Sequence, residues 1–416
     1  MQVENDFQYC YTQPMDRIGE LLTRGVANII PGKKELEEQL RAGKKLNIYL
    51  GIDPTSTKIH LGHAVALRKL QAFSELGHHV TFLIGDFTAL IGDTSDKDTE
   101  RPVLTSDEIK QNFQTYKNQA EKIVDFSKIT IRQNSEWLKK LTFEDIIKLT
   151  QHFSVGDFVG RELIRKRLSD NKRVGLHEFL YPVMQGYDSY FMDTDIQIGG
   201  TDQTFNMQAG RTLQKDLRNK QSFVMTNIIM EGTDGRKMSK SWGNAIWLDD
   251  TPEDIYAKVM AINDELIIPY YTIATNVPLT EISEAEVALK KGEHPMTIKK
   301  ELAYEISKEL TSLEKAESAK KNFEKRVQRG ETPQEIPTVP VSVAFEDGRG
   351  IVDVLLKTKL AKTRSDAKRV TEQGGVELLL SNGTKKITNV KQMIEFEEGM
   401  IIKVGKRKFM RLVLEK

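Results

Sequence analysis

The sequence has one cysteine, Cys10, in 416 residues, and it has no long hydrophobic run. A single cysteine excludes an internal disulfide framework and a cysteine-based zinc site, and it is typical of a reducing cytosol. The first residues, Met1–Asp6, have neither the basic nor the apolar part of an export signal, and no stretch approaches the ~20 apolar residues of a membrane helix. We therefore expect a soluble cytoplasmic chain with no membrane attachment.

The chain also lacks a strong net charge, since 61 Lys and Arg face 60 Asp and Glu. This balance hides an asymmetry. Residues 347–416 hold sixteen basic and nine acidic side chains, a charge of +7, which leaves 45 against 51, a charge of −6, for the remainder. Such a basic tail indicates a polyanionic partner for the last domain, the alternative being a basic surface without a specific partner.

Two segments far apart in the sequence predict a site for a triphosphate. His60-Leu-Gly-His63 follows the strand-like run Leu46–Ile52 and begins a helical pattern, and backbone N–H groups at a helix N-terminus attract phosphate. Lys237-Met-Ser-Lys-Ser241 is a short loop with two cations. Taken alone, the first segment fits a capped helix start as well as it fits a phosphate site, and the second fits an ordinary solvated loop. Together they supply both kinds of phosphate ligand.

The hydrophobic pattern predicts an α/β fold for the first 250 residues. Strand-like and helix-like segments alternate, with predicted strands at 46–52, 79–85, 128–132, 195–200 and 223–230 and predicted helices at 62–77, 105–126 and 201–216. Ligands bind such parallel sheets at the carboxyl ends of the strands. Thr251, followed by Pro252, begins a helical region that extends to 329. A proline-containing linker at 330–348 precedes a small α+β domain.

These motifs carry a family resemblance. The segments 60–63 and 237–241 resemble the two signatures of class I aminoacyl-tRNA synthetases, and the wider text resembles bacterial tyrosyl-tRNA synthetases over nearly the whole chain, at Gly51–His63, Gly85–Asp93, Tyr181–Asp188 and Gln197–Gln203. The resemblance implies a tyrosine–tRNA ligase that activates L-tyrosine with ATP, with Mg²⁺ accompanying the ATP, and transfers tyrosine to tRNA(Tyr).

The resemblance also implies the domains. They are a Rossmann-like parallel-sheet catalytic domain at 1–250, an α-helical anticodon-side domain at 251–329, the linker at 330–348 and an S4-like RNA-binding domain at 349–416. A homodimer is expected, with its interface within 141–173, a segment rich in Phe, Val and Arg.

The same resemblance assigns roles to residues. The predicted catalytic residues, which act on the phosphates, are Thr55, His60, His63, Lys237 and Lys240. Tyr49 and Asp188 bracket the phenol hydroxyl of tyrosine, Asp93, Tyr181 and Gln185 hold its ammonium group, and Gln203 lies between the two substrates. The predicted ATP-binding residues are Gly51, Asp53, Pro54, Gly62, Gly200, Asp202, Met238, Ser239, Lys240 and Ser241. The predicted tRNA-binding residues are Arg364, Lys368, Arg369, Lys406, Arg407 and Lys408.

No protein metal site is expected, because the two histidines lack a convincing third ligand nearby. Two features depart from the family pattern: the loop at 92–97 lacks the usual Pro-Ser-Gly, and the bulky Trp242 follows the lysine loop. Three alternatives remain open at this stage. They are another nucleotidyltransferase that forms a small-molecule adenylate, a tryptophan-specific synthetase, and an RNA-binding protein that kept a synthetase scaffold without its activity.

Overall fold

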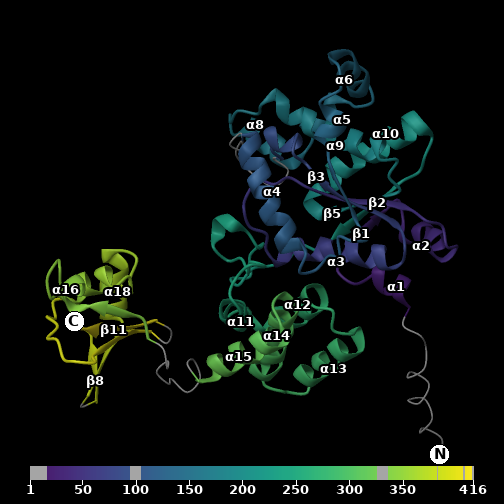
Figure 1. Ribbon diagram of the computed structural model, residues 1–416. Coiled ribbons are helices and arrows are strands. Elements are labelled where there is room, and N and C mark those ends of the chain that lie inside the picture. The colour runs from purple at the N-terminus through teal and green to yellow at the C-terminus, as the bar shows by residue number, and fades with distance from the viewer. Residues whose placement is uncertain (1–15, 94–104, 326–335, 382, 406–407, 415–416) are drawn as a thin grey trace, which may run out of the picture. The chain divides into compact units, whose positions relative to one another are not determined.

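The computed structural model describes residues 16–93, 105–325, 336–381, 383–405 and 408–414 (Figure 1). The chain forms two compact units, Met1–Ala316 and Glu317–Lys416. Several residues singled out in the sequence lie outside the described residues: Cys10, Lys406, Arg407 and most of the loop at 92–97.

A six-stranded sheet forms the centre of the first unit. Its strands are β1 (Val26–Ile30), β2 (Asn47–Ile52), β3 (His79–Ile84), β4 (Thr130–Gln133), β5 (Ile196–Gly200) and β6 (Phe223–Asn227), in the spatial order β1-β6-β5-β2-β3-β4. Strands β2 to β6 are parallel, and Ile48 of β2 lies opposite both Val80 and Ile196. The chain proceeds outward from β2 to β4 and resumes at β5 on the other side of β2. The switch point therefore lies between β2 and β5, where ligands bind in such sheets.

Helices surround this sheet (Figure 1). They are α1 (Arg17–Leu21), α2 (Lys33–Arg41), α3 (Leu61–Glu75), α4 (Ser106–Ala120), α5 (Ser135–Leu138), α6 (Phe143–Thr150), α7 (Val155–Val159), α8 (Glu162–Ser169), α9 (Leu176–Phe191) and α10 (Thr204–Arg218). Thr251 caps α11 (Pro252–Met260) through its side chain, with Pro252 in the first turn, as the sequence predicts. Then follow α12 (Ile267–Ala274), α13 (Leu279–Lys290), α14 (Pro295–Leu310) and α15 (Leu313–Phe323), with no strand in the described part of 251–325.

The predicted α/β fold is confirmed, with corrections at its edges. Strand β1 was not predicted, and it pairs antiparallel with β6, so the sheet is not wholly parallel. Helix α4 ends at Ala120 rather than near Phe126, because the chain turns before Asp125, whose carboxylate accepts a hydrogen bond from the Ser127 amide. None of the described helices is both long and apolar enough to span a bilayer.

Two arginines, Arg24 after α1 and Arg68 on α3, bind the end of helix α12. Arg24 Nε donates to the carbonyl of Thr272 at 2.7 Å, and Arg68 donates to the carbonyl of Ala274 at 2.7 Å. These carbonyls end α12, where a helix has no backbone donors of its own for them, and cations there also complement the helix dipole. Arg68 lies on α3, so the helix that begins at the histidine signature is bound directly to the end of α12.

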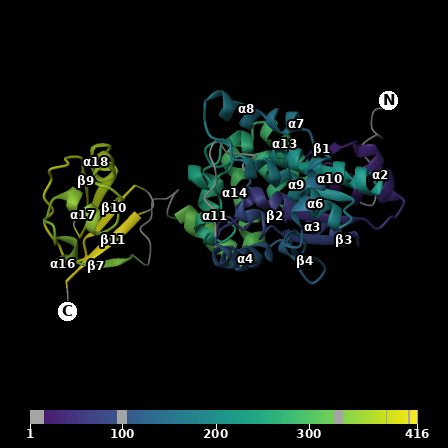
Figure 2. The ribbon, with the colours of Figure 1, turned by 90° about the horizontal axis from the view of Figure 1, so that it is seen from above.

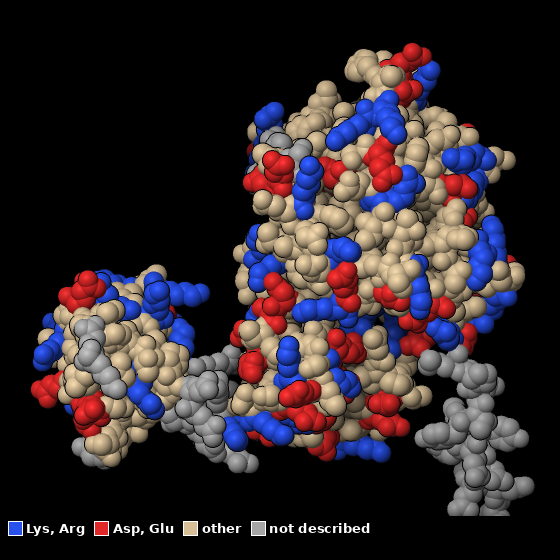
Figure 3. Space-filling view, in the orientation of Figure 1, with Lys and Arg blue, Asp and Glu red and all other residues tan. Residues whose placement is uncertain are grey.

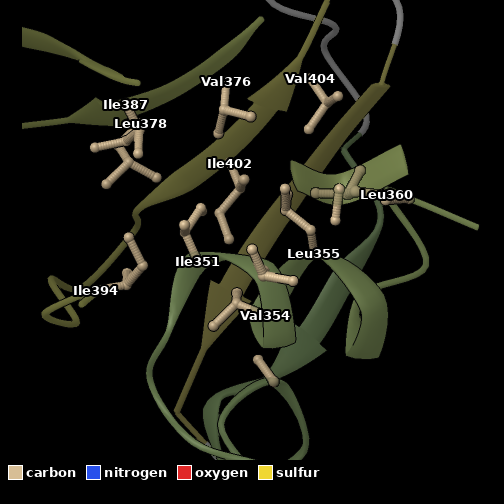
Figure 4. Packing of buried hydrophobic residues seen from close by; sticks show 14 of the residues in the cluster. Ile351, Val354, Leu355, Leu360, Val376, Leu378, Ile387, Ile394, Ile402 and Val404 are labelled. Atoms are coloured by element: carbon tan, nitrogen blue, oxygen red, sulfur yellow. The ribbon is translucent and has the colours of Figure 1, made fainter. Parts of the chain in front are cut away.

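The second unit is a small α+β structure. Its sheet has the order β7-β11-β10-β8-β9, formed by β7 (Thr338–Pro340), β8 (Val376–Leu380), β9 (Gly383–Ile387), β10 (Ile401–Val404) and β11 (Lys408–Val413). The helices α16 (Val341–Ala344), α17 (Ile351–Lys357) and α18 (Arg364–Glu372) lie beside this sheet (Figure 2). Aliphatic side chains of α17, such as Val354 and Leu355, pack against Val376 and Ile402 of the strands (Figure 4).

Candidate active site

A pocket lies at the switch point between β2 and β5. Its walls come from the ends of the strands, the loops that follow them and one face of α9, and the lining residues are Tyr49, Gly51, Ile52, Asp53, Leu83, Gly85, Thr88, Asn134, Tyr181, Gln185, Asp188, Ile198, Gly199, Gln203 and Met207. Six of the residues predicted from the sequence to bind tyrosine or ATP through their side chains are among them. The pocket thus joins segments that are distant in the sequence.

One end of the pocket is a buried hydroxyl–carboxylate pair. The Tyr49 hydroxyl donates to Gln197 Oε1 at 3.1 Å, and the Asp188 carboxylate accepts from Trp137 Nε1 at 2.7 Å and from Asn134 Nδ2 at 3.1 Å. Burial raises the pKa of Asp188 to about 8, although the hydrogen bonds from Asn134 and Trp137 act in the opposite direction. Burial and the nearby Asp188 charge raise the pKa of Tyr49 well above its usual value. Tyr49 is therefore neutral and able to donate.

A second polar group lies around Tyr181 and Gln185. The Tyr181 hydroxyl donates to Asp53 Oδ2 at 2.8 Å, and Asp53 also accepts from the Thr88 hydroxyl at 2.7 Å. Asp93 does not itself line the pocket; its carboxylate accepts from Gln203 Nε2 at 2.6 Å. The structure therefore connects Tyr181 to a residue predicted to bind ATP and connects Asp93 to the residue predicted to lie between the substrates.

The two histidines adopt one defined arrangement at the start of α3. His60 is the N-cap residue and its Nδ1 accepts from the Gly62 amide at 3.1 Å, while His63 Nδ1 accepts from the His60 amide at 3.2 Å. The ring centroids are 4.0 Å apart. Burial, with the neighbouring charges of His63 and Lys237, lowers the pKa of His60 to about 2. Since Nδ1 accepts in both neutral rings, the proton lies on Nε2, which is a donor.

Backbone pairing holds the start of the histidine helix beside the segment that follows the lysine loop. The Leu61 amide donates to the carbonyl of Ile246 at 3.0 Å and the Leu248 amide to the carbonyl of Ile59 at 3.0 Å. Lys237 Nζ forms an ion pair with Asp202 Oδ2 at 3.1 Å. Lys237 also lies close enough to His60 to lower the pKa of that ring, so the lysine loop and the start of the histidine helix are neighbours.

The remaining residues of the lysine loop differ in exposure. Lys240 begins a short 3₁₀ turn, Lys240–Trp242, and its side chain is exposed with no partner in the described part of the chain. The Ser239 and Ser241 hydroxyls lie 3.0 Å apart. Met238 is 2% exposed, so its side chain anchors the loop.

The other predicted ATP residues cluster at the carboxyl ends of β2 and β5. Gly51 lies at the end of β2 and Asp53 directly follows the strand, and Thr55 lies in a turn where its amide donates to the carbonyl of Asp53 at 2.7 Å. The Pro54 carbonyl accepts from Asn112 Nδ2, which fixes this turn. Gly200 ends β5 and Asp202 follows it. At Gly62, an added Cβ would lie 2.9 Å from the His60 ring, which supports glycine there for packing as well as for ligand approach.

Sequence reasoning missed four polar residues around the pocket: Thr88, Asn134, Trp137 and Gln197. Asn134 and Gln197 are fully buried. Gln197 could have been identified from the sequence, since it is a polar residue in an otherwise apolar predicted strand and a buried amide requires hydrogen-bond partners. Nothing in the sequence indicates that Asn134 and Trp137 reach Asp188.

In the second unit, the predicted tRNA-binding residues that the structure describes lie on α18 and at the start of β11. Arg364, Lys368 and Arg369 are exposed. Arg364 pairs with Asp353, and Arg369 pairs with Asp366 at 2.6 Å. Lys408 Nζ donates to the carbonyl of Leu360 at 2.7 Å. On the face seen in Figure 3, basic side chains are spread over this unit with acidic ones among them. Within the described residues, no three His, Cys, Asp or Glu side chains form a metal site.

Comparisons with known proteins agree on one family. The family model described as tRNA synthetases class I (W and Y) matches residues 41–328. The tyrosine–tRNA ligase of Thermotoga maritima is 41% identical over 395 residues, 94% of this chain and 96% of that protein. The tyrosine–tRNA ligase of Dehalococcoides mccartyi is 41% identical over 405 residues, 96% of this chain and its entire own length.

Solved structures support the fold at lower identity. A tyrosyl-tRNA synthetase from Archaeoglobus fulgidus complexed with L-tyrosine has a TM-score of 0.58 at 22% identity, over 73% of this chain and 98% of that one. A C-terminally truncated mitochondrial tyrosyl-tRNA synthetase from Aspergillus nidulans has a TM-score of 0.63 at 22% identity, over 74% and 94%.

Proposed function

We propose roles for the residues of this chain from one premise: the chain belongs to the class I tRNA synthetases for tryptophan and tyrosine. Its activity is that of a tyrosine–tRNA ligase, which forms tyrosyl-adenylate and pyrophosphate from L-tyrosine and ATP and then charges tRNA(Tyr). The observation that carries the residue assignment is the buried pair of Tyr49 and Asp188 in one pocket.

The phenol end of the pocket recognises tyrosine. The substrate hydroxyl donates to Asp188 and accepts from Tyr49, which gives up its hydrogen bond to Gln197. Phenylalanine would form neither hydrogen bond and would place an apolar ring edge against two buried polar groups in a closed pocket. A site of this kind rejects an analogue without the hydroxyl by about 10⁴-fold or more, a rule for which tyrosyl-tRNA synthetases are themselves the worked example.

The polar groups toward the pocket mouth hold the rest of the two substrates. Tyr181, Gln185 and Asp93 receive the ammonium group of tyrosine, and Gln203 lies between tyrosine and ATP. Asp202 accepts from the ribose hydroxyls, which requires Lys237 to leave its ion pair with Asp202. The remaining contacts to ATP come from Gly51, Asp53, Pro54, Gly62, Gly200, Met238, Ser239, Lys240 and Ser241.

Activation needs charge neutralisation and positioning and no covalent enzyme intermediate. A tyrosine carboxylate oxygen forms a bond to the α-phosphorus of ATP, the bond from that phosphorus to the bridging oxygen breaks, and pyrophosphate leaves. The Nε2–H groups of His60 and His63 and the Thr55 hydroxyl donate to phosphate oxygens. Lys237 and Lys240 bind the leaving pyrophosphate. Mg²⁺ arrives with ATP and is held mainly by phosphates and water.

Three further features complete the proposal. The unit after the linker is an S4-like tRNA-binding domain, and the helices from 251 to 329 form the anticodon-side domain. The protein is a cytoplasmic homodimer. The dimer proposal rests on large apolar side chains exposed in and around 141–173, where Phe143 and Val155 are 80% and 77% exposed, since such a patch marks an interface.

The test is ATP–pyrophosphate exchange with each of the twenty amino acids. Tyrosine alone should support exchange, and Lys240→Ala should lower its rate by about 10²–10³-fold while tyrosine binding persists. Exchange with tryptophan instead would place the chain in the tryptophan branch of its family, and no exchange with any amino acid would favour an RNA-binding role.

A chain truncated after Gly330 should keep pyrophosphate exchange and lose tRNA charging. If both activities fall together, the tail is a folding element of the catalytic unit.

A further inference from the structure

The loop that carries Lys237 and Lys240 is organised around one buried amide. Asn244 is 3% exposed and follows the 3₁₀ turn and Gly243. Its Oδ1 accepts from the Ser239 amide at 2.9 Å. Its Nδ2 donates to the carbonyl of Lys237 at 3.1 Å and to Asp234 Oδ1 at 2.7 Å. One side chain thus binds the backbone on both sides of Met238.

The surroundings fix the orientation of this amide. Asp234 is an acceptor only, and it is held in turn by Arg236 Nε at 2.9 Å. The hydrogen bonds from Asn244 and Arg236 keep the pKa of Asp234 at about 2, so Asp234 is ionised across the working pH range. Since Nδ2 faces a carboxylate and the carbonyls of Arg236 and Lys237 while Oδ1 faces an N–H group, a flipped amide would lose these hydrogen bonds.

Tight packing leaves the amide no alternative position. A Cβ at Gly232 would lie 2.4 Å from Asn244 Cγ, and the Thr233 amide donates to the Asn244 carbonyl at 3.1 Å. The backbone amide of Met238, between the two residues that Asn244 binds, donates to the carbonyl of Met230 at 2.9 Å. The loop backbone is therefore held from both sides, while the Lys240 side chain extends into solvent.

We infer that Asn244 is a positioning residue for adenylate formation, which fixes the backbone from which Lys237 and Lys240 reach the leaving pyrophosphate. This inference rests on the proposed function. Asn244 acts through the loop and touches neither substrate. A misplacement of reacting groups by about 1 Å costs about 10²-fold in rate, so loss of this amide should act on the chemical step rather than on tyrosine binding.

Three variants test the inference. Asn244→Ala removes all the hydrogen bonds, and Asn244→Asp places an oxygen against the carbonyl of Lys237 and the carboxylate of Asp234. Each should lower kcat of tyrosine-dependent exchange by about 10–10²-fold, with the KM for tyrosine within about twofold of the native value. In the double variant Asn244→Asp with Asp234→Asn, the amide introduced at position 234 donates to the carboxylate introduced at position 244, so part of the kcat loss should be recovered. Asn118→Asp, at an exposed asparagine of α4, is the matched control.

Hydrogen exchange separates this role from a general loss of stability. The Ser239 amide should exchange faster in Asn244→Ala, while amides of β2 and β5 keep their protection. A native kcat in Asn244→Ala would overturn the inference, as would a loss of protection throughout the first unit with kcat and tyrosine affinity falling together. If the native protein shows no tyrosine-dependent pyrophosphate exchange, the proposed function fails. Hydrogen exchange at the Ser239 amide still reports whether Asn244 orders the loop.

Discussion

The pocket between β2 and β5 and the basic C-terminal unit place polar side chains in opposite surroundings. In the pocket, Tyr49 and Asp188 are 3% and 2% exposed, and both have hydrogen-bond partners that are themselves buried. On α18, the side chains of Arg364 and Arg369 are 64% and 59% exposed, and each pairs with an acidic residue of the same unit. The pocket offers its substrate few groups in fixed positions, and the helix offers many groups in adaptable positions.

This difference determines how much each residue contributes. A buried polar group left without a partner costs several kcal/mol, so the pocket can distinguish two amino acids by one hydroxyl. Exposed charges contribute little each and are screened by salt. We therefore expect specificity for the amino acid to depend on single residues of the first unit. Affinity for tRNA should depend on the summed charge of the second.

The largest effect is expected from the phenol pair. Tyr49→Phe and Asp188→Ala should each narrow the preference for tyrosine over phenylalanine by about 10²-fold or more, because each removes a hydrogen bond that tyrosine forms in the pocket and phenylalanine cannot form. The measurement is kcat/KM in pyrophosphate exchange with both amino acids. Tyr190→Phe, which removes a hydroxyl from the same helix outside the pocket lining, is the control. If both pocket variants keep the native preference for tyrosine over phenylalanine, Tyr49 and Asp188 do not recognise the substrate hydroxyl.

The second effect concerns stability and compares a buried ion pair with an exposed one. Arg167 and Glu178 are 2% and 1% exposed and 2.6 Å apart, and Glu178 also accepts from the Gly175 amide. Glu178→Ala should lower the free energy of unfolding by about 3–5 kcal/mol, because it leaves a buried guanidinium without its carboxylate. Asp366→Ala, which breaks the exposed pair on α18, should leave the urea midpoint nearly unchanged. Equal midpoint shifts would contradict the assumed effect of burial.

The sequence predicted most of the first unit because its signals are local. Strands β2, β3 and β5 are apolar runs that end at glycine or aspartate, and Thr251 with Pro252 is a complete helix start. The edge strand β1 escaped prediction because five residues at the rim of a sheet have no clear periodicity. The site residues inside motifs were predicted, whereas their supports were not.

The supports of the pocket escaped prediction because they are long-range contacts. Asn134 and Trp137 meet Asp188 across more than fifty residues of sequence, and Gln197 meets Tyr49 across 148. Only the strand order, with β5 returning beside β2, brings such segments together. Asn244 lies close to the lysine loop in the sequence, but its hydrogen bonds to both sides of Met238 depend on the tertiary path of the loop.

A smaller effect should appear in the pH dependence of tyrosine activation. Trp137 donates to Asp188 and lowers its pKa, against the effect of burial, which raises it to about 8. Trp137→Phe should therefore raise this pKa further and move the rising limb of kcat/KM for tyrosine to higher pH, because the substrate hydroxyl donates to the ionised carboxylate. Phe191→Leu, which removes the ring stacked on Trp137, keeps the donor and should leave the midpoint in place. A shift in both variants would assign the effect to packing.

The same group affects stability. The folded pKa of Asp188 lies above its ordinary value of 3.8, so the folded state holds more protons than the unfolded state between about pH 4 and pH 8. The stability contributed by Asp188 is therefore present below this range and is lost as the pH rises through it. Asp188→Asn, which cannot ionise, should flatten this part of the stability profile measured by urea unfolding.

The smallest effect per residue is expected on α18. Lys368 is exposed and has no partner in the described part of the chain, so it is available to a phosphate without breaking an ion pair. Lys368→Ala should raise the KM for tRNA severalfold, reduce the slope of log affinity against log salt by ~1, and leave pyrophosphate exchange unchanged. Arg364→Ala should cost less, because Arg364 must first leave Asp353. Lys128→Ala, at an exposed lysine of the first unit, is the control. If Lys128→Ala and Lys368→Ala weaken tRNA binding alike, the basic surface acts only through its total charge, and α18 is not the tRNA contact.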